Sequence, residues 1–206
     1  DQRHGELVVS GLGYEQAKGA VTPGEASHGW NEEEEDTKLE AGEAREYRGL
    51  AARSNYLALD RPDIQYSTKE VCRGMSNPSE ADRRRLKRLG RFLVERPRVI
   101  SHFRWQGRME EVSGYSDSDW AGCRRTAKST SGGVLMWGGH CLKSWSATQK
   151  NITLSSGEAE LVAAVKMSTE LIGIAQLAHD LGMEVEGRWY VDSEAAIGVV
   201  SRRGNG

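Results

Sequence analysis

The order of residue patterns over residues 111–201 constrains the fold more than any other feature. VSGYSDSDW at 112–120 alternates between apolar and polar residues, which predicts a half-buried strand. TSGGVLMWGGHCLKSWSA at 130–147 predicts two strands joined by a turn at Gly138-Gly139-His140. These patterns together predict three antiparallel strands in succession.

A long helix should follow, capped by Ser155 or Ser156, running to about Leu181 and ended by Gly182. Its predicted apolar stripe is Leu161, Ala164, Val165, Ser168, Leu171, Ile172, Ala175 and Leu181. RWYVD at 188–192 then predicts a fourth strand, parallel to the first, and SEAAIGVVSRR a further helix. We therefore expect an α/β domain with a mixed sheet over residues 111–206.

The first half of the chain reads differently. Residues 1–39 are rich in glycine and end in the acidic run EEEED, so we expect a flexible acidic leader. Residues 40–110 predict a helical connector. One helix lies in GEAREYRGLAARSNYLALD, with Leu50, Tyr56, Leu57 and Leu59 on one side. A second begins at Pro62, a third is capped by Ser79 and ended by Pro97, and VISHFRW is extended.

Three acidic residues stand where this fold makes acids costly. Asp117 is at the end of the first strand, Glu160 is on the first turns of the long helix, and Asp192 is at the end of the fourth strand. If the first and fourth strands are parallel neighbours, the three carboxylates meet and repel unless a cation lies between them. Mg²⁺ or Mn²⁺, as two ions, suits such oxygen ligands and phosphodiester chemistry. Taken singly, an aspartate at a strand end more often stabilises a turn, and a glutamate in an early helical turn more often interacts with the helix dipole.

Two neighbouring acids compete for these roles. We favour Asp117 over Asp119 because we expect Asp117 to close the strand and Asp119 to lie in the following turn. The preference for Glu160 over Glu158 is weaker, since Glu158 is also placed to cap the helix or to support the site from outside.

The charge distribution indicates a polyanionic partner. Residues 83–108 hold 10 Lys and Arg and one Glu, a net charge of +9, whereas residues 1–46 hold 12 acids and 4 bases, a net charge of −8. The alternative is a solvated helix face. The candidate nucleic-acid contacts are Arg84, Arg88, Arg91, Arg124, Arg125, Lys128, Ser129 and Ser131. The two serines are equally suited to cap the hairpin.

The cysteines and the apolar runs bear on the cellular compartment of the protein. Three cysteines without a CxxC pair indicate reduced thiols in an intracellular compartment, and no zinc-ligand spacing occurs. No apolar run approaches the roughly 20 residues that a membrane span needs, and the N-terminus has no signal pattern. We therefore expect no membrane association.

Four motifs in order resemble the ribonuclease H domain of copia-type retrotransposon Pol polyproteins. They are YSDSDWAGC (115–123), KSTSGGVLMWGGHCLKSWSATQK (128–150), LSSGEAELVAA (154–164) and WYVDSEAAI (189–197). Residues 47–93 resemble the segment that connects reverse transcriptase to ribonuclease H in the same polyproteins. The resemblance implies the ribonuclease H fold, an RNA–DNA hybrid substrate, reverse transcriptase as the neighbouring part, and Asp117, Glu160 and Asp192 as metal ligands. It places the chain in the cytoplasm, a virus-like particle or the nucleus.

Two departures limit the resemblance. The family carries a later acidic or histidine-bearing motif, whereas this chain stops at SRRGNG, so we expect a domain incomplete at its C-terminus. No YxDD-like polymerase motif occurs. The alternatives to an active hybrid nuclease are therefore a catalytically inactive nucleic-acid-binding remnant and a structural linker of such a polyprotein.

Overall fold

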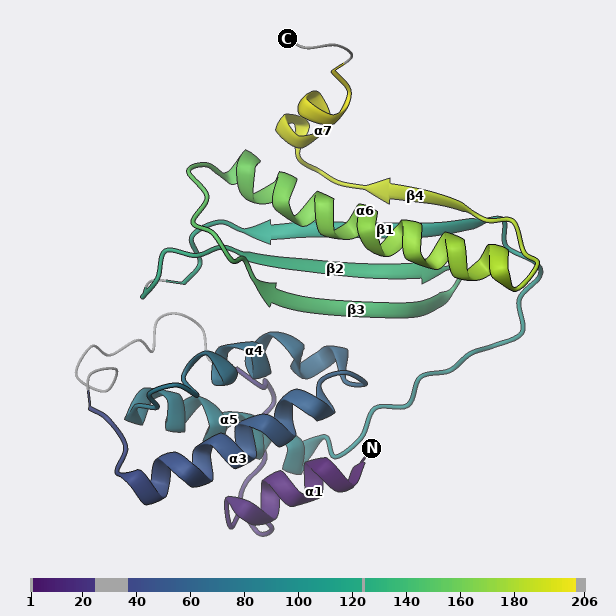
Figure 1. Ribbon diagram of the computed structural model, residues 1–206. Coiled ribbons are helices and arrows are strands. Elements are labelled where there is room, and N and C mark those ends of the chain that lie inside the picture. The colour runs from purple at the N-terminus through teal and green to yellow at the C-terminus, as the bar shows by residue number, and fades with distance from the viewer. Residues whose placement is uncertain (1, 25–36, 124, 203–206) are drawn as a thin grey trace. The chain divides into compact units, whose positions relative to one another are not determined.

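The structure is a computed structural model that describes residues 2–24, 37–123 and 125–202. The chain divides into two units, residues 1–101 and residues 102–206, each with its own hydrophobic core (Figure 1). The structure separates the chain near residue 101, about ten residues before the predicted boundary between connector and nuclease-like part. The division into leader, connector and nuclease-like part stays a prediction.

The first unit is helical. Its helices are α1 (Gln2–Gly11), α3 (Ala41–Leu57), the 3-10 helix η2 (Pro62–Ile64), α4 (Gln65–Arg73) and α5 (Glu80–Glu95). Helix α5 begins with a capping box, because the Ser79 hydroxyl accepts from the Asp82 amide while the Asp82 carboxylate accepts from the Ser79 amide. The predicted cap at Ser79 and the end of the helix before Pro97 are confirmed.

The core of the first unit lies between these helices. Helix α3 buries Ala44, Tyr47, Ala51, Ser54 and Leu57. The predicted stripe was wrong for Tyr56 and Leu59, which are exposed, although Leu57 is buried as expected. The small residues at 44, 51 and 54 let α3 approach its neighbours closely, and a pattern search that weighs large apolar residues overlooks such a face.

The N-terminal residues are ordered, contrary to the flexible leader that we expected. Residues 2–11 form α1, which packs on α3 and α5 and buries Val8 completely. Val8, Val9 and Leu12 recur at helical spacing. The pattern is short and has glycines on both sides, so the sequence analysis missed the helix. The acidic run EEEED lies outside the described residues.

The second unit is a four-stranded sheet with a long helix on one face (Figure 1). Its strands are β1 (Glu111–Asp119), β2 (Thr130–Trp137), β3 (His140–Thr148) and β4 (Glu186–Tyr190), in the order β3-β2-β1-β4. The pairs β1–β2 and β2–β3 are antiparallel and β1–β4 is parallel, so the predicted mixed sheet is confirmed. The stretch VISHFRW, which we expected to be extended, forms neither a helix nor a strand.

Helices α6 (Ser156–Asp180) and α7 (Glu194–Val200) complete the second unit. The Ser155 hydroxyl caps α6 by accepting from the Glu158 amide, and Gly182 follows its end with φ +76°, both as predicted. Helix α6 lies across β1, β2 and β4. At Gly114 of β1 the absent side chain leaves room for Met167 and Leu171.

The buried face of α6 differs from the predicted stripe. It consists of Ala159, Glu160, Ala163, Ala164, Met167, Leu171 and Ala178. Ala164 and Leu171 were predicted, whereas Val165, Ile172 and Leu181 are exposed. Apolar residues occur around most of this helix, so periodicity alone does not select the face that meets the sheet.

Helix α6 also bears on the expectation that no segment is suited to a membrane. By length and composition alone it is long and apolar enough to cross one, which differs from our expectation. A single helix of this kind is weak support for a span, because core helices pass the same test. Here one side of α6 packs on the sheet and buries the carboxylate-bearing Glu160.

Candidate metal centre

Three elements bring the predicted acids to one place. Asp117 belongs to β1, opposite Gly132 of β2. Glu160 is in the second turn of α6, and Asp192 follows the end of β4 by two residues. The parallel pairing of β1 with β4 matches Tyr115 with Tyr190, so each aspartate lies two residues beyond this pair. Parallel pairing thus places both carboxylates at the same end of the sheet.

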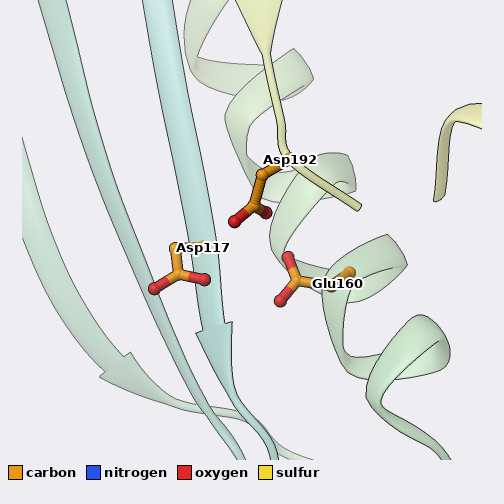
Figure 2. Close-up of side chains that lie close together, drawn as sticks. All are labelled: Asp117, Glu160 and Asp192. Atoms are coloured by element: carbon orange, nitrogen blue, oxygen red, sulfur yellow. The ribbon is translucent and has the colours of Figure 1, made fainter. Parts of the chain in front are cut away.

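The three carboxylates form a cluster that we call the acidic triad. One oxygen from each of Asp117, Glu160 and Asp192 lies within 4.8 Å of the others (Figure 2). The two aspartates are exposed and the glutamate is buried. This arrangement is open to solvent on one side and backed by α6 on the other.

Glu160 is held by one of its two oxygens. Its Oε1 accepts from the Ser118 amide at 3.1 Å and from the Ser118 hydroxyl at 2.7 Å. Its Oε2 is buried and has no hydrogen-bond partner among the described residues, although the residue is only 8% exposed. A buried carboxylate oxygen without a partner is costly, because it has lost its water and gained nothing in return.

A hard divalent cation fits this site. The donors are all carboxylate oxygens, which Mg²⁺ and Mn²⁺ prefer. A cation among them would offset the mutual repulsion of three like charges and would give the unpartnered Glu160 oxygen a ligand. The residues present therefore fit the metal that the sequence predicts.

The two competing acids have other surroundings. Glu158 Oε2 accepts from the Leu154 amide at 2.7 Å, so Glu158 caps α6, as one of our two interpretations had it. Asp119 pairs with Thr130 inside β1. Our reason for preferring Asp117, that it closes the strand, was wrong, because the β1–β2 pairing extends two residues further.

The predicted serine contacts lie inside the second unit. Ser129 is fully buried, where its hydroxyl accepts from the Ala121 amide and bonds the Thr153 hydroxyl. Ser131 is also buried and accepts from the Gln149 side chain. These hydroxyls are buried and bond within the second unit, which favours the hairpin-capping alternative over a contact with nucleic acid.

The predicted basic contacts fall in two places. Arg125, which is exposed, and Lys128, which is half-buried, lie in the turn after β1, and Arg124 is outside the described residues. In the first unit, Arg88 donates to the Thr22 carbonyl and hydroxyl, and Arg91 donates to the Lys18 carbonyl. Arg84 is half-buried on the same helix. Part of the basic helix therefore holds residues 18–22 in place.

Some supporting residues escaped the sequence analysis. Ser118, between the two aspartates of SDSD, fixes Glu160. Gln149 is buried and donates to the Ala159 carbonyl at 2.9 Å, which anchors the start of α6 beside β2. The rings of Tyr115 and Tyr190 stack with centroids 5.1 Å apart. The alternating pattern of β1 was the sequence signal that could have pointed to Ser118. The Gln149 hydrogen bond and the Tyr115–Tyr190 stack are visible only in the fold.

Glu111, at the opposite end of β1 from the acidic triad, has an ion-pair partner. Glu111 Oε2 lies 3.2 Å from Arg188 Nε, and Glu111 Oε1 accepts from the Ser113 and Tyr190 hydroxyls. The Ser113 hydrogen bond, followed by those of Tyr190 and the charge of Arg188, lowers the pKa of Glu111. The acidic triad has no comparable ion pair among the described residues, so its negative charge is available to a cation.

Comparison with known proteins relates the chain to transposon polyproteins. Over 142 residues, 68% of the chain, it is 35% identical to the retrovirus-related Pol polyprotein from transposon RE1 of Arabidopsis thaliana. Over the same length it is 31% identical to that from transposon TNT 1-94 of Nicotiana tabacum. The chain spans about a tenth of the length of these polyproteins. No family model and no solved structure matches it.

A shorter relative is covered more fully. The chain is 31% identical over 116 residues to Secreted RxLR effector protein 161 of Plasmopara viticola, and the match covers 56% of this chain and 81% of that protein. The predicted relation to retrotransposon Pol polyproteins is confirmed at this level. The chain belongs to the sequence family that includes this Plasmopara viticola protein, and its homologues include the retrovirus-related Pol polyproteins of plant transposons.

Proposed function

We propose that residues 111–206, within the second unit, form a ribonuclease H-like domain that hydrolyses RNA in RNA–DNA hybrids as part of a retrotransposon polyprotein. In this proposal residues 40–110 are the segment that connects it to reverse transcriptase. The observation that carries it is the acidic triad, in which Asp117, Glu160 and Asp192 converge and one buried glutamate oxygen is unpartnered. The relation to Pol polyproteins supports the same reading.

Each residue of the triad has a distinct part in holding two Mg²⁺ or Mn²⁺ ions. Glu160, fixed by Ser118, is the rigid ligand, because its oxygen is already oriented and desolvated. Asp117 and Asp192 are the exposed ligands on the side from which a phosphodiester approaches. When bound, the ions supply Lewis acidity toward the scissile phosphate and lower the pKa of a bound water.

The rest of the second unit supports substrate binding. Arg125 and Lys128 lie in the turn that follows β1, close in sequence to Asp117, and are suited to sequence-independent contacts with phosphates. Arg84, Arg88 and Arg91 of the first unit stay predicted phosphate contacts, although Arg88 and Arg91 already donate to the Thr22 and Lys18 carbonyls. Salt should weaken substrate binding if these groups contribute, since each contact releases a counterion.

The test is cleavage of a labelled RNA–DNA hybrid by the full chain with Mg²⁺ or Mn²⁺. We expect the wild-type chain to cut the RNA strand, and Asp192→Asn to slow cutting by about a thousandfold, equivalent to roughly 4 kcal/mol of barrier. Asp119→Asn is the matched control, because it removes a neighbouring carboxylate of β1 that is outside the triad, and it should cut within a few-fold of wild type.

The alternatives give different results in this assay. Equal cutting by wild type and Asp192→Asn would overturn the catalytic assignment. Binding of the hybrid without cutting would favour the inactive nucleic-acid-binding remnant. Thermal denaturation with Mn²⁺ separates metal binding from catalysis, since the cation should stabilise the wild-type chain and fail to stabilise Asp192→Asn.

A further inference from the structure

The loop over residues 102–110, which precedes β1 in the second unit, has no helix or strand. Trp105, in its middle, is 96% exposed, the highest value among the large apolar side chains that the structure describes. An indole carries a large apolar face and a polar N–H group, so an exposed tryptophan offers a contact surface to a partner.

The loop is nevertheless fixed in place. The Gln106 side chain donates to the Trp137 carbonyl at 2.9 Å and accepts from the Gly139 amide at 3.0 Å. The Trp137 indole donates to the Met109 carbonyl at 3.2 Å. The Phe103 ring meets His140 edge-on with centroids 5.2 Å apart. These contacts tie the loop to the β2–β3 turn on both sides of Trp105, so the indole is presented from a defined backbone.

The β2–β3 turn is shaped for this contact. Gly138 has φ +57°, a conformation that L side chains rarely adopt. A Cβ built at this position would lie 2.5 Å from Gln106 Oε1. The glycine therefore serves both the turn and the close approach of the Gln106 amide.

The charges of the loop select the class of partner. Arg104 and Arg108 flank the indole, are exposed, and form no ion pair or hydrogen bond with any residue the structure describes. By contrast, Arg88 and Arg91 of α5 donate to carbonyls within their own unit. An apolar protein partner would bury two guanidinium groups without counter-charges, which is costly.

We infer that residues 103–108 bind single-stranded nucleic acid, with a base stacked on Trp105 and phosphates on Arg104 and Arg108. Aromatic side chains stack on any base, and neighbouring arginines neutralise the backbone, which is the usual combination in single-strand binding. The inference rests on the proposed function for its class of ligand. The site itself is separate from the acidic triad.

The spacing assigns the loop a place along the substrate. It joins β1 at Glu111, and Asp117 is six residues further along the strand, about 20 Å at the usual rise per residue. The loop would thus hold a strand that flanks the cutting site.

The test is the affinity of the full chain for a fluorescein-labelled single strand of about 12 nucleotides, a length within the range of single-strand sites. The measurement is made in EDTA, so that it does not depend on metal or on cutting. Trp105→Ala should weaken binding about 5- to 150-fold, the equivalent of one stacked base, and Trp105→Phe should retain most of the affinity. Arg104→Ala with Arg108→Ala should lower the salt dependence of binding.

Matched controls distinguish this site from general effects. Leu154→Ala removes an apolar side chain that is 87% exposed, and Arg45→Ala with Arg53→Ala removes two exposed arginines of the first unit. Neither change should weaken binding more than twofold. A strand with abasic positions should bind the wild type as weakly as the normal strand binds Trp105→Ala.

Unchanged affinity of Trp105→Ala would overturn the inference whether or not the chain cuts a hybrid. Loss of cutting in Asp192→Asn with single-strand binding intact would leave both proposals standing. Absence of cutting by the wild type, with Trp105-dependent binding, would refute only the proposed nuclease.

Discussion

The two units differ in the surroundings of their buried acidic side chains. The helical unit surrounds a core of thirteen buried apolar residues and closes its buried charges with ion pairs. The sheet unit has a core cluster of four buried apolar residues, together with partly buried neighbours such as Trp137 and Trp189, and leaves three carboxylates crowded together. Buried polar groups that stabilise a fold have hydrogen-bond or ion-pair partners in the protein, whereas unpartnered groups are expected at functional sites, where a ligand can supply the partner.

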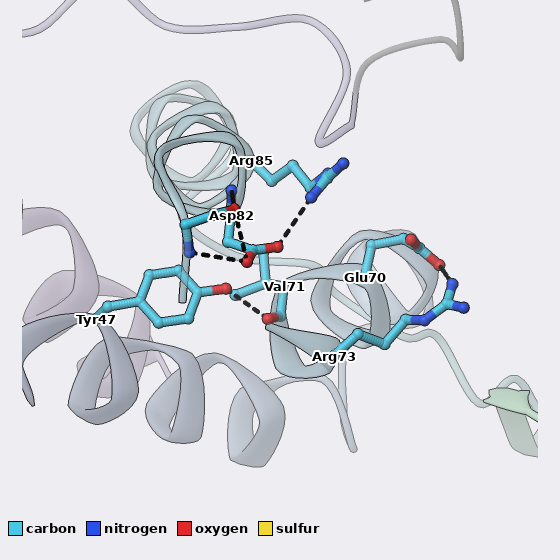
Figure 3. A network of polar contacts seen from close by, with 7 residues as sticks. Tyr47, Glu70, Val71, Arg73, Asp82 and Arg85 are labelled. Carbon is cyan, nitrogen blue, oxygen red and sulfur yellow. Dashed lines mark hydrogen bonds and ion pairs between the residues drawn. The ribbon is translucent and has the colours of Figure 1, made fainter. Parts of the chain in front are cut away.

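The helical unit shows this satisfaction in detail (Figure 3). Asp82 is fully buried, yet it accepts from the Ser79 backbone and pairs with Arg85 at 2.8 Å. Tyr47 donates its hydroxyl to the Val71 carbonyl. Burial acts to raise the pKa of Glu70, but hydrogen bonds and charges from Lys69 and Arg73 outweigh it and lower that pKa. Each of these groups has a protein partner.

The largest expected effect tests whether the units are independent. Leu89→Ala in α5 removes a fully buried side chain and should destabilise the helical unit by about 2–5 kcal/mol, because the cavity cannot collapse completely. Hydrogen exchange should then accelerate for the amides of α3 and α5 and stay unchanged in β1 and β2. An equal loss of protection in both units would show that they unfold together and that the comparison drawn above is wrong.

A pair of isosteric substitutions should have opposite signs in the two units. Asp63→Asn breaks a two-pronged contact to Arg61, which is only 4% exposed, and should cost about 2 kcal/mol, less than a fully buried pair because Asp63 is partly exposed. Asp117→Asn relieves repulsion in the acidic triad and should stabilise the metal-free chain by at most about 1 kcal/mol.

Denaturation in EDTA measures both variants. If Asp117→Asn is as destabilising as Asp63→Asn, the triad is satisfied by the fold and is not built for a cation. Adding Mn²⁺ sharpens the comparison, since the cation should stabilise Asp63→Asn as it does the wild type and should have no such effect on Asp117→Asn.

The smallest effect concerns the cysteines. Burial raises the pKa of the Cys72 thiol in the helical unit, and Cys141 of β3 is exposed. Iodoacetamide at neutral pH should therefore modify Cys141 first and Cys72 at least about tenfold more slowly, since the thiolate is the reactive form. Peptide mass spectrometry follows both rates. Equal rates would reveal frequent opening of the helical unit, and denaturant should abolish the difference.

Much of the fold followed from local chemistry. Ser79, Ser155 and Gly182 mark helix ends through hydrogen bonds and backbone angles that act within a few residues, so their positions were legible in the sequence. The hairpin at Gly138-Gly139 is local in the same sense. The predicted faces of α3 and α6 were partly wrong, because small residues at their buried faces gain their place only from the neighbour that they meet.

For the acidic triad, too, part of the site follows from the sequence and part only from the tertiary structure. The sequence by itself determined which acids stand at a strand, an early helical turn and a second strand end, because those elements are encoded locally. Only the tertiary structure decided that Asp117, Glu160 and Asp192 converge, that Ser118 occupies one Glu160 oxygen, and that the other is left without a partner. Convergence depends on strand pairing and helix packing between residues up to 75 positions apart, and no local pattern records those contacts.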